Sequence, residues 1–523
     1  MNTYLLLDIA ASIMPEQEIV TCGDRRLSYS ELTERTNRLA SVLSSYGAQP
    51  GDRIGFIATG GSETLETFFA AFQLGASIVP INYRAKADEL EYMIRDAGVK
   101  WLVIEKRYAD LVSPTLTGTD IAKVICIGGH HPIGLEYEEA LASAVIPMEG
   151  FADVDNSDLA ILLYTSGTTN RPKGVMITYG QLTSYVMNHS EACDGTPKGS
   201  SLICVPSYHI AGATSLCNCI YSGRRMILLS QFDAGSWLQA VEKEKTTHAF
   251  LVPTMLSQVM NHPAFTSTDM NSLESLSYGA APMPLPVIKK AIELFPDTVS
   301  FANAFGMTET TSTVCVLDPE DHKLNGTPEE NQKKLERLAS VGRPLPDVEI
   351  LILNEDNEPA APKSIGNVYV RTAKAMKGYW NRPEASEETL VNGWVNTNDM
   401  GWMDEDGYLF LCGRSSDMVI RGGENISPAE IESVLMDHPG VADVAVIGVP
   451  SLEWGEEVVA VVVPLNPQAP PEDELISFCS GRLASYKRPS KIEFAAELPR
   501  TSTGKILKRQ LREQYDGKSS IKQ

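Results

Sequence analysis

Residues 164–174 read Tyr-Thr-Ser-Gly-Thr-Thr-Asn-Arg-Pro-Lys-Gly. The apolar run 159–163 before this stretch predicts a buried strand, and residues 178–189 after it predict a helix with Thr178 as N-cap. Backbone N–H groups and hydroxyls in such a loop can surround phosphate oxygens, glycine permits close approach, and lysine adds positive charge. The stretch therefore favours a nucleoside triphosphate as ligand. Its candidate contact residues are Thr165, Ser166, Gly167, Thr168, Thr169 and Lys173.

The loop is not a Walker A loop, because the Gly-x-x-x-x-Gly-Lys-Ser/Thr pattern is absent and Pro172 precedes the lysine. Its composition alone also allows a polar surface loop without a ligand. The other motifs of the chain decide between these two interpretations.

Length and charge limit the kind of protein. A chain of 523 residues is long enough for two or three domains. Its net charge of −23 argues against nucleic acid and anionic membranes as partners, which would require a basic face. The 8 histidines and 9 cysteines form no metal-binding pattern. No signal peptide or run of about 20 apolar residues is evident, so we expect a cytoplasmic protein without a transmembrane segment.

Helix and strand signals alternate in the first part of the chain. They begin with a capping box at residues 28–31 and imply a mainly parallel sheet that is covered on both faces. From about residue 340, shorter strands separated by turn residues indicate a small β subdomain. A compact unit then starts with a helix over 429–436, capped by Ser427 and Pro428. We predict an α/β fold with a large N-terminal domain of doubly wound sheets, residues 1–414, and a small mobile α+β domain, residues 415–523.

Six further motifs occur along the chain in a definite order. They are residues 205–209 (VPSYH), 278–282 (YGAAP), 302–310 (ANAFGMTET), 396–401 (NTNDMG), 413–417 (GRSSD) and 499–505 (PRTSTGK). Together with residues 164–174 they resemble, in family order, the motifs of the adenylate-forming (ANL) superfamily. That superfamily includes acyl-CoA synthetases, peptide-synthetase adenylation domains and beetle luciferases.

The resemblance implies a two-step reaction. A carboxylate attacks the α-phosphate of ATP to give acyl-AMP and pyrophosphate, and a thiol then takes the acyl group. It implies that Glu309 is a Mg²⁺ ligand and that Thr308 bonds the α-phosphate. Asn303 would meet the adenine edge, and Phe305, where the family more often has tyrosine, would stack on the base. The nucleotide-binding set from this motif is Asn303, Ala304, Phe305 and Gly306.

Three charged residues complete the catalytic set that the resemblance implies. Asp399, expected in a short polar loop after Trp394, would accept both ribose hydroxyls, and Arg414 would contact ribose or phosphate oxygens, although a structural salt bridge is the alternative for Arg414. Lys505 would bridge the incoming carboxylate and the α-phosphate. Because Lys505 lies in the C-terminal domain, that domain must close for adenylation and move for thiol attack. The hinge is expected at Ser416, where the family commonly has aspartate or lysine.

Other motif residues are expected to bind CoA and the acid. Gly422 and Gly423 resemble the segment that approaches the pantetheine arm of CoA, with a tight turn as the alternative. His209 would be a gate between the acyl pocket and the thiol tunnel, or else a satisfied, partly buried histidine. The acyl-pocket candidates are small and uncharged: Ala211, Ser215, Gly279, Ala280, Ala281 and Thr313.

The predicted function is that of an ATP-dependent acid:CoA ligase for a fatty, aryl or alicyclic acid, with Mg²⁺ as cofactor and ATP and CoA as co-substrates. One alternative is an adenylating enzyme that loads an acid or amino acid onto a carrier protein. Such enzymes typically place an aspartate near the position of His209, and no carrier domain is expected here. A degenerate nucleotide-binding scaffold is disfavoured because Lys173, Glu309, Asp399, Arg414 and Lys505 are all present. The sequence leaves the acid and the oligomeric state open, a homodimer being one option.

Overall fold

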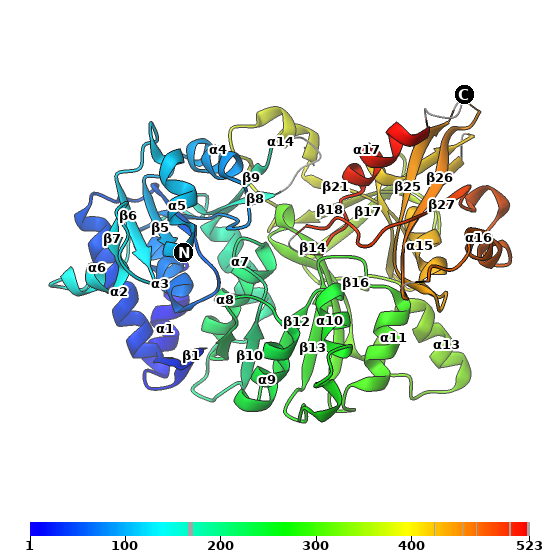
Figure 1. Cartoon of the computed structure of the whole chain (residues 1–523). Coiled ribbons are helices and arrows are strands. Elements are labelled where there is room, and N and C mark those ends of the chain that lie inside the picture. The colour runs from blue at the N-terminus through cyan, green and yellow to red at the C-terminus, as the bar shows by residue number, and fades with distance from the viewer. Residues whose placement is uncertain (166–170, 423, 452, 467, 502–503, 520–523) are drawn as a thin grey trace.

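The computed structural model describes residues 1–165, 171–422, 424–451, 453–466, 468–501 and 504–519. The strands of these residues form four sheets. Figure 1 shows the unit coloured orange to red at one end of the molecule, and the edge strands β6 and β7 at the opposite end. Within the described ranges, no helix is both long enough and apolar enough to cross a membrane.

Two large sheets form the centre of the N-terminal region. The first is nine-stranded, and its strands in spatial order are β16 (Arg343–Pro344), β15 (Ser312–Leu317), β14 (Ser300–Met307), β13 (Ser275–Gly279), β12 (His248–Leu251), β10 (Ser200–Ile203), β11 (Arg225–Leu228), β1 (Glu18–Cys22) and β2 (Arg25–Ser28). The second is eight-stranded: β19 (Gly378–Tyr379), β9 (Lys173–Thr178), β8 (Leu159–Thr165), β4 (Ser77–Pro80), β3 (Arg53–Ile57), β5 (Trp101–Glu105), β6 (Lys123–Ile127) and β7 (Leu135–Glu136). The inner strands of both are parallel, as expected for strands joined by helices, and antiparallel strands are added at the edges.

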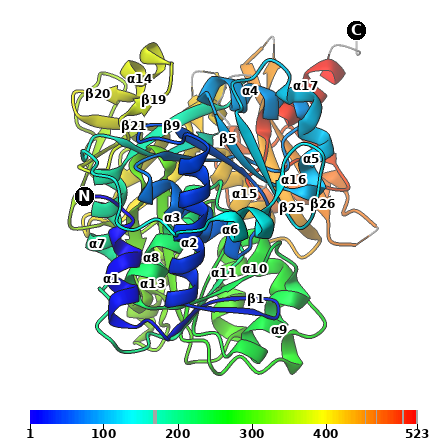
Figure 2. The same cartoon turned by 90° about the vertical axis from the view of Figure 1, so that its left-hand side faces the viewer.

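Helices fill the space between these sheets and cover their outer faces. The helices of the N-terminal region are α1 (Leu5–Ile13), α2 (Tyr29–Ser45), α3 (Ser62–Gln73), α4 (Ala87–Ala97), α5 (Lys106–Val112), α6 (Tyr137–Ser143), α7 (Tyr179–His189), α8 (Ile210–Ser222), α9 (Ala234–Glu244), α10 (Pro253–Met260), α11 (Leu285–Leu294), α12 (Pro319–His322), α13 (Pro328–Arg337) and α14 (Pro383–Thr389). One apolar cluster joins α1, α2, α3, α7 and α8 to strands of both large sheets. Separate clusters attach α9, α10 and α11 to the nine-stranded sheet, and α4 and α5 to the eight-stranded sheet. In Figure 2 the molecule is turned so that the side with α1, α2 and α3 faces the viewer.

Two smaller sheets lie in the second half of the chain. One contains β17 (Val348–Leu353), β18 (Gly366–Thr372), β21 (Trp394–Met403), β20 (Leu390–Val391) and β22 (Leu409–Arg414). The last contains β24 (Glu424–Ile426), β23 (Val419–Arg421), β26 (Gly455–Pro464), β25 (Val441–Ser451) and β27 (Lys491–Phe494), with the helices α15 (Pro428–Met436), α16 (Glu472–Ser480) and α17 (Lys508–Ser519). This last unit has two apolar clusters of its own.

The α/β class with mixed sheets and a separate C-terminal unit is confirmed, and several local expectations are corrected. Asp399 lies in the strand β21 and not in a polar loop. Ser427 occupies the N-cap position of α15, but its hydroxyl donates to the Cys412 carbonyl (2.6 Å) and does not cap the helix. The helix expected after the 164–174 stretch is present as α7 with Thr178 as its N-cap, and the strand β9, paired antiparallel with β8, lies between the stretch and this helix.

Candidate active site

Both sides of the 164–174 loop are anchored to helix α4. The Tyr164 hydroxyl donates to Asp96 (2.7 Å), and the Tyr92 hydroxyl donates to the Pro172 carbonyl (3.2 Å). Burial and the hydrogen bond to Asp96 raise the pKa of Tyr164, so it remains a neutral donor. The loop therefore starts and ends at defined positions on one helix. The predicted contacts Ser166, Gly167, Thr168 and Thr169 lie outside the described residues.

The strand β14, third from one end of the nine-stranded sheet, carries the second group of candidates. Asn303 and Phe305 lie in β14, where the Asn303 amide donates to the Ser340 carbonyl (3.3 Å), and Thr308 opens a short 3-10 turn (Thr308–Thr310). Gly306 lies where β14 and β15 approach closely, since a Cβ there would come within 1.9 Å of the Ser312 carbonyl oxygen. Only glycine permits this approach, which brings the turn next to β15.

Glu309 is buried and held by a residue that the sequence interpretation missed. Its carboxylate accepts a hydrogen bond from the Tyr379 hydroxyl (2.7 Å), and its carbonyl accepts one from the Met376 backbone (2.8 Å). Lys173 lies with its Nζ 5.0 Å from the centroid of the Tyr379 ring. Tyr379 thus contacts both Lys173, which begins β9 after the 164–174 loop, and Glu309, the candidate metal ligand. No pattern in the sequence marks Tyr379, because its position next to Glu309 follows from the pairing of β19 with β9.

Asp399 and Arg414 face each other on neighbouring strands. They are register partners in β21 and β22, and the Arg414 Nε lies 2.9 Å from an Asp399 oxygen. Burial raises the pKa of Asp399, while the positive charges of Arg414 and Lys505 act in the opposite direction. Arg414 also donates to the Thr397 carbonyl (2.6 Å). The ion pair engages one of the two Asp399 oxygens.

Lys505 reaches this group from the C-terminal unit. Burial and the nearby Arg414 lower the pKa of Lys505, and the negative charges of Asp399, Asp417 and Glu309 oppose that shift. Gly504 has φ +79°, and a Cβ there would lie 2.6 Å from the Thr254 hydroxyl on α10. A residue with a side chain would therefore disturb both this backbone turn and its contact with the large region.

The connection between the two regions is short. Arg414 ends β22, residues 415–417 form a 3-10 turn that contains Ser416, and Val419 begins β23 of the last sheet. Gly422 has φ +60° and lies against the Trp454 ring. Gly423 lies outside the described residues.

The acyl-pocket candidates come from three elements. Ala211 and Ser215 lie one turn apart on α8, where the Ser215 hydroxyl donates to the Ala211 carbonyl (2.6 Å), and Thr313 lies in β15. Gly279 is the last residue of β13, and Ala280 and Ala281 follow it, with Ala280 at φ +64°. His209 is the N-cap of α8; burial, together with the nearby Arg84, lowers its pKa to about 4. His209 is therefore a neutral imidazole at pH 7.

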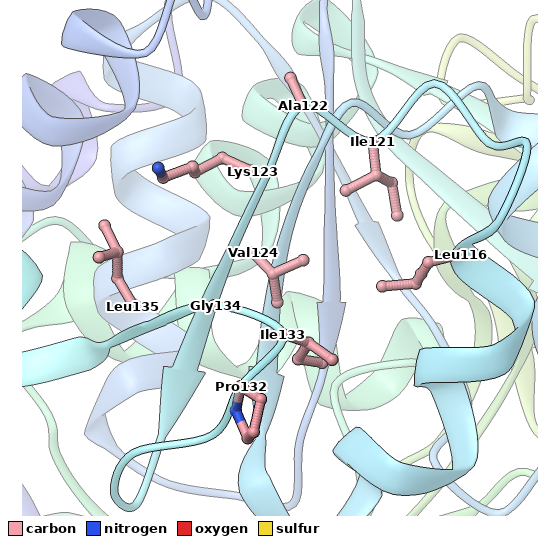
Figure 3. Close-up of a pocket in the computed structure, with 9 residues that line it drawn as sticks. All are labelled: Leu116, Ile121, Ala122, Lys123, Val124, Pro132, Ile133, Gly134 and Leu135. Carbon is pink, nitrogen blue, oxygen red and sulfur yellow. The ribbon is translucent and has the colours of Figure 1, made fainter.

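A surface hollow lies away from the residues predicted for the site. It measures about 390 Å³ and lies at the β6–β7 edge of the eight-stranded sheet, as Figure 3 shows. Its lining residues include Leu116, Ile121, Lys123 and Leu135. None of the residues predicted for the site lines this hollow.

The sequence of this chain is similar to known protein families and to individual enzymes. Residues 7–380 match the family described as AMP-binding enzyme, and residues 430–505 match the AMP-binding enzyme C-terminal domain. The chain is 36% identical over 506 residues to a feruloyl-CoA synthase of an Amycolatopsis species, with 97% of each chain covered. It is 30% identical over 514 residues to the fatty acid–[acyl-carrier-protein] ligase ScoC of Streptomyces coeruleorubidus, covering 97% of this chain and 95% of that one.

A solved structure is similar over the whole length. The anthranilate CoA ligase AuaEII in complex with anthranoyl-AMP superposes with a TM-score of 0.89 at 25% sequence identity. The superposition covers 100% of this chain and 98% of that chain. The two chains therefore share the arrangement of the sheets and of the C-terminal unit.

Proposed function

This chain belongs to the AMP-binding enzyme family, and on that basis we propose that it is an ATP-dependent acid:CoA ligase. It activates a carboxylic acid as acyl-AMP with release of pyrophosphate and transfers the acyl group to CoA. The observation that carries this proposal is the convergence of Glu309, Asp399 and Lys505, from three separate parts of the chain, on one site.

The charges of the site suit the first half-reaction. A carboxylate and a polyphosphate repel each other, so their approach needs a fixed positive charge and hydrogen-bond donors at the reacting atoms. Lys505 supplies that charge, and the Thr308 hydroxyl donates to the α-phosphate. Asp399 accepts from the ribose hydroxyls, while Phe305 and Asn303 meet the adenine.

The donor set also fits Mg²⁺. In the part of the chain that the structure describes, no group of three or more His, Cys, Asp or Glu side chains could hold a metal ion. A single buried carboxylate, Glu309, suits Mg²⁺ because this ion usually binds one or two carboxylates together with substrate phosphates. Bound there, Mg²⁺ would neutralise phosphate charge, and Tyr379 would hold the Glu309 carboxylate in place.

The second half-reaction needs a different arrangement of the two regions. If Lys505 bridges the carboxylate and the α-phosphate in the first half-reaction, the C-terminal unit has to turn about Ser416 after adenylation to admit the thiol of CoA. Gly422 then approaches the pantetheine arm, and neutral His209 lies between the acyl pocket and the thiol. The nine free cysteine thiols support a reducing compartment, and we place the enzyme in the cytoplasm.

The acid carries an uncharged tail. Small, uncharged residues at the pocket candidates support a fatty or aryl tail, and the similarity to a feruloyl-CoA synthase supports an aryl one. An amino group buried there without a carboxylate partner would be costly. The similarity to ScoC keeps a carrier protein as the alternative acyl acceptor.

The test is a panel of fatty, aryl and amino acids scored by ATP–pyrophosphate exchange. Product analysis follows with CoA and, separately, with a holo acyl carrier protein. We expect exchange with fatty or aryl acids and an acyl-CoA product. Exchange with amino acids alone, or acyl transfer to the carrier protein but not to CoA, would contradict the proposal.

A further inference from the structure

An ion pair joins the helix α17 to the connection between the two regions. The Arg512 Nη2 of this helix lies 2.8 Å from a carboxylate oxygen of Asp417, the last residue of the 3-10 turn at residues 415–417. The two side chains are 26% and 22% exposed. Because water screens partly buried charges less than exposed ones, both charges act on the groups around them.

Asp417 lies within electrostatic reach of the candidate catalytic lysine. Burial and the nearby Arg414 lower the pKa of Lys505. The negative charges that oppose this shift are those of Asp399, Asp417 and Glu309. Asp399 and Glu309 belong to the large region, whereas Asp417 follows the predicted hinge and therefore stays with the unit that carries Lys505. Asp417 is thus a potential partner that accompanies the lysine in either arrangement of the two regions.

The backbone at Lys505 is held in a closed loop. The Thr501 N–H donates to the Lys505 carbonyl (2.8 Å), and the Lys505 N–H donates to the Thr501 hydroxyl oxygen (3.1 Å). The Arg500 guanidinium donates to the Gly504 carbonyl in the same loop. With its backbone held, the lysine changes partners by rotation about its flexible side-chain bonds. The charges within reach of the side chain therefore decide where the ammonium lies.

A carboxylate without a partner would compete for that ammonium. A partly buried negative charge is costly unless a positive charge or hydrogen bonds compensate it, so an unpaired Asp417 would gain by turning toward Lys505. The lysine would then be displaced from the position in which it bridges the substrate carboxylate and the α-phosphate. Arg512 prevents this competition because its guanidinium already engages the Asp417 carboxylate.

We propose that Arg512 is a positioning residue for adenylation, which engages Asp417 and so leaves the Lys505 ammonium for the substrates. The helix gives the guanidinium a fixed base, since the neighbouring Leu511 is 1% exposed and packs in an apolar cluster with residues of β25 and β26. This inference rests on the proposed acid:CoA ligase function and adds a residue outside the nucleotide site to it.

The test removes each charge singly and then both together, in Arg512→Met, Asp417→Asn and the double variant. Adenylation is measured by ATP–pyrophosphate exchange with an acid that the wild type activates, and acyl transfer by acyl-CoA formation from synthetic acyl-AMP. We expect Arg512→Met to slow exchange about tenfold, because the unpaired carboxylate draws Lys505 away. Asp417→Asn and the double variant should stay within about threefold of the wild type, because the competing charge is gone. Acyl transfer should change little in all three.

A second ion pair of α17 supplies the matched control. Lys508 lies 2.6 Å from a carboxylate oxygen of Glu432 on α15, and these side chains are 13% and 20% exposed. Lys508→Met therefore breaks a comparably buried pair of the same helix, and it should keep the wild-type rate of exchange. Arg512→Lys retains the positive charge and should recover part of the rate lost in Arg512→Met. Melting temperatures show whether each variant folds, and Arg512→Gln replaces Arg512→Met if the latter does not.

The pattern of losses decides between positioning and a merely structural ion pair. Wild-type exchange in Arg512→Met overturns the inference. Equal losses in Arg512→Met, Asp417→Asn and the double variant, or in Lys508→Met, overturn it as well, because the broken pair and not the freed carboxylate would then be the cause. In all these cases the acid:CoA ligase function stands. A wild type that shows no exchange with any acid overturns both.

Discussion

The large region, residues 1–414, holds its site residues by contacts among themselves, whereas the C-terminal unit, residues 415–519, presents one lysine on a short loop. Glu309 is bonded to Tyr379, and Asp399 is paired with Arg414. Lys505 instead approaches from a unit with its own sheet and apolar clusters, and Gly504 contacts Thr254 across the two regions. The difference teaches that the candidate residues of the large region are held by one another, whereas the position of Lys505 depends on how the C-terminal unit is placed.

The largest effect should come from removing that lysine. Lys505→Ala should slow acyl-AMP formation by about 10²–10³-fold, because one oriented charge is lost where two anions meet. The second half-reaction, from synthetic acyl-AMP and CoA, should change little. Both halves are measured separately, by pyrophosphate release and by acyl-CoA formation. Equal losses in both halves would mean that the lysine serves more than one arrangement.

A smaller effect tests the preorganised side of the comparison. Tyr379→Phe removes the hydrogen bond that orients Glu309, and it should raise the Mg²⁺ concentration needed for half-maximal pyrophosphate exchange about tenfold. Tyr29→Phe is the control, since its buried hydroxyl donates to the Ile220 carbonyl (2.6 Å) away from the site. An unchanged Mg²⁺ requirement in Tyr379→Phe would separate Tyr379 from the metal site.

The connection between the regions should matter less than either site. Ser416→Pro fixes φ at the predicted hinge and should slow one half-reaction on the order of fivefold while sparing the other. Ser416→Ala, which removes the hydroxyl without restraining the backbone, should behave as the wild type. Wild-type rates for the proline variant in both halves would move the hinge elsewhere.

The last prediction concerns the stability of the large region at acid pH and involves no change in the rate of either half-reaction at neutral pH. Burial lowers the pKa of His209 to about 4, so between pH 6.5 and 4 the unfolded chain binds a proton that the folded chain does not. Stability therefore falls as pH falls through this window, by on the order of 2 kcal/mol between pH 7 and 5. His209→Asn should lose less melting temperature than the wild type over this range. Equal losses would show that His209 titrates normally.

The motifs predicted the family and the α/β class, and both are confirmed. They also named Glu309, Asp399, Arg414 and Lys505, which the structure brings together, although their roles stay predictions. Local patterns failed where tertiary contacts decide the local structure. Asp399 has turn-forming neighbours, yet pairing with β22 makes it part of a strand. Ser427 has the chemistry of a cap, yet the Cys412 carbonyl is its partner.

The sequence by itself determined the chemistry: a hydroxyl-rich loop with a lysine, an acidic turn and a distant Thr-Gly-Lys. These features are local sequence patterns, because binding one part of a ligand requires particular residue types close together along the chain. Only the tertiary structure decided which distant side chains meet, such as Tyr379 with Glu309, and Lys374 with His189, Asp347 and Tyr185. Those contacts join residues up to 189 positions apart, and sheet pairing and burial, not spacing along the chain, bring them together.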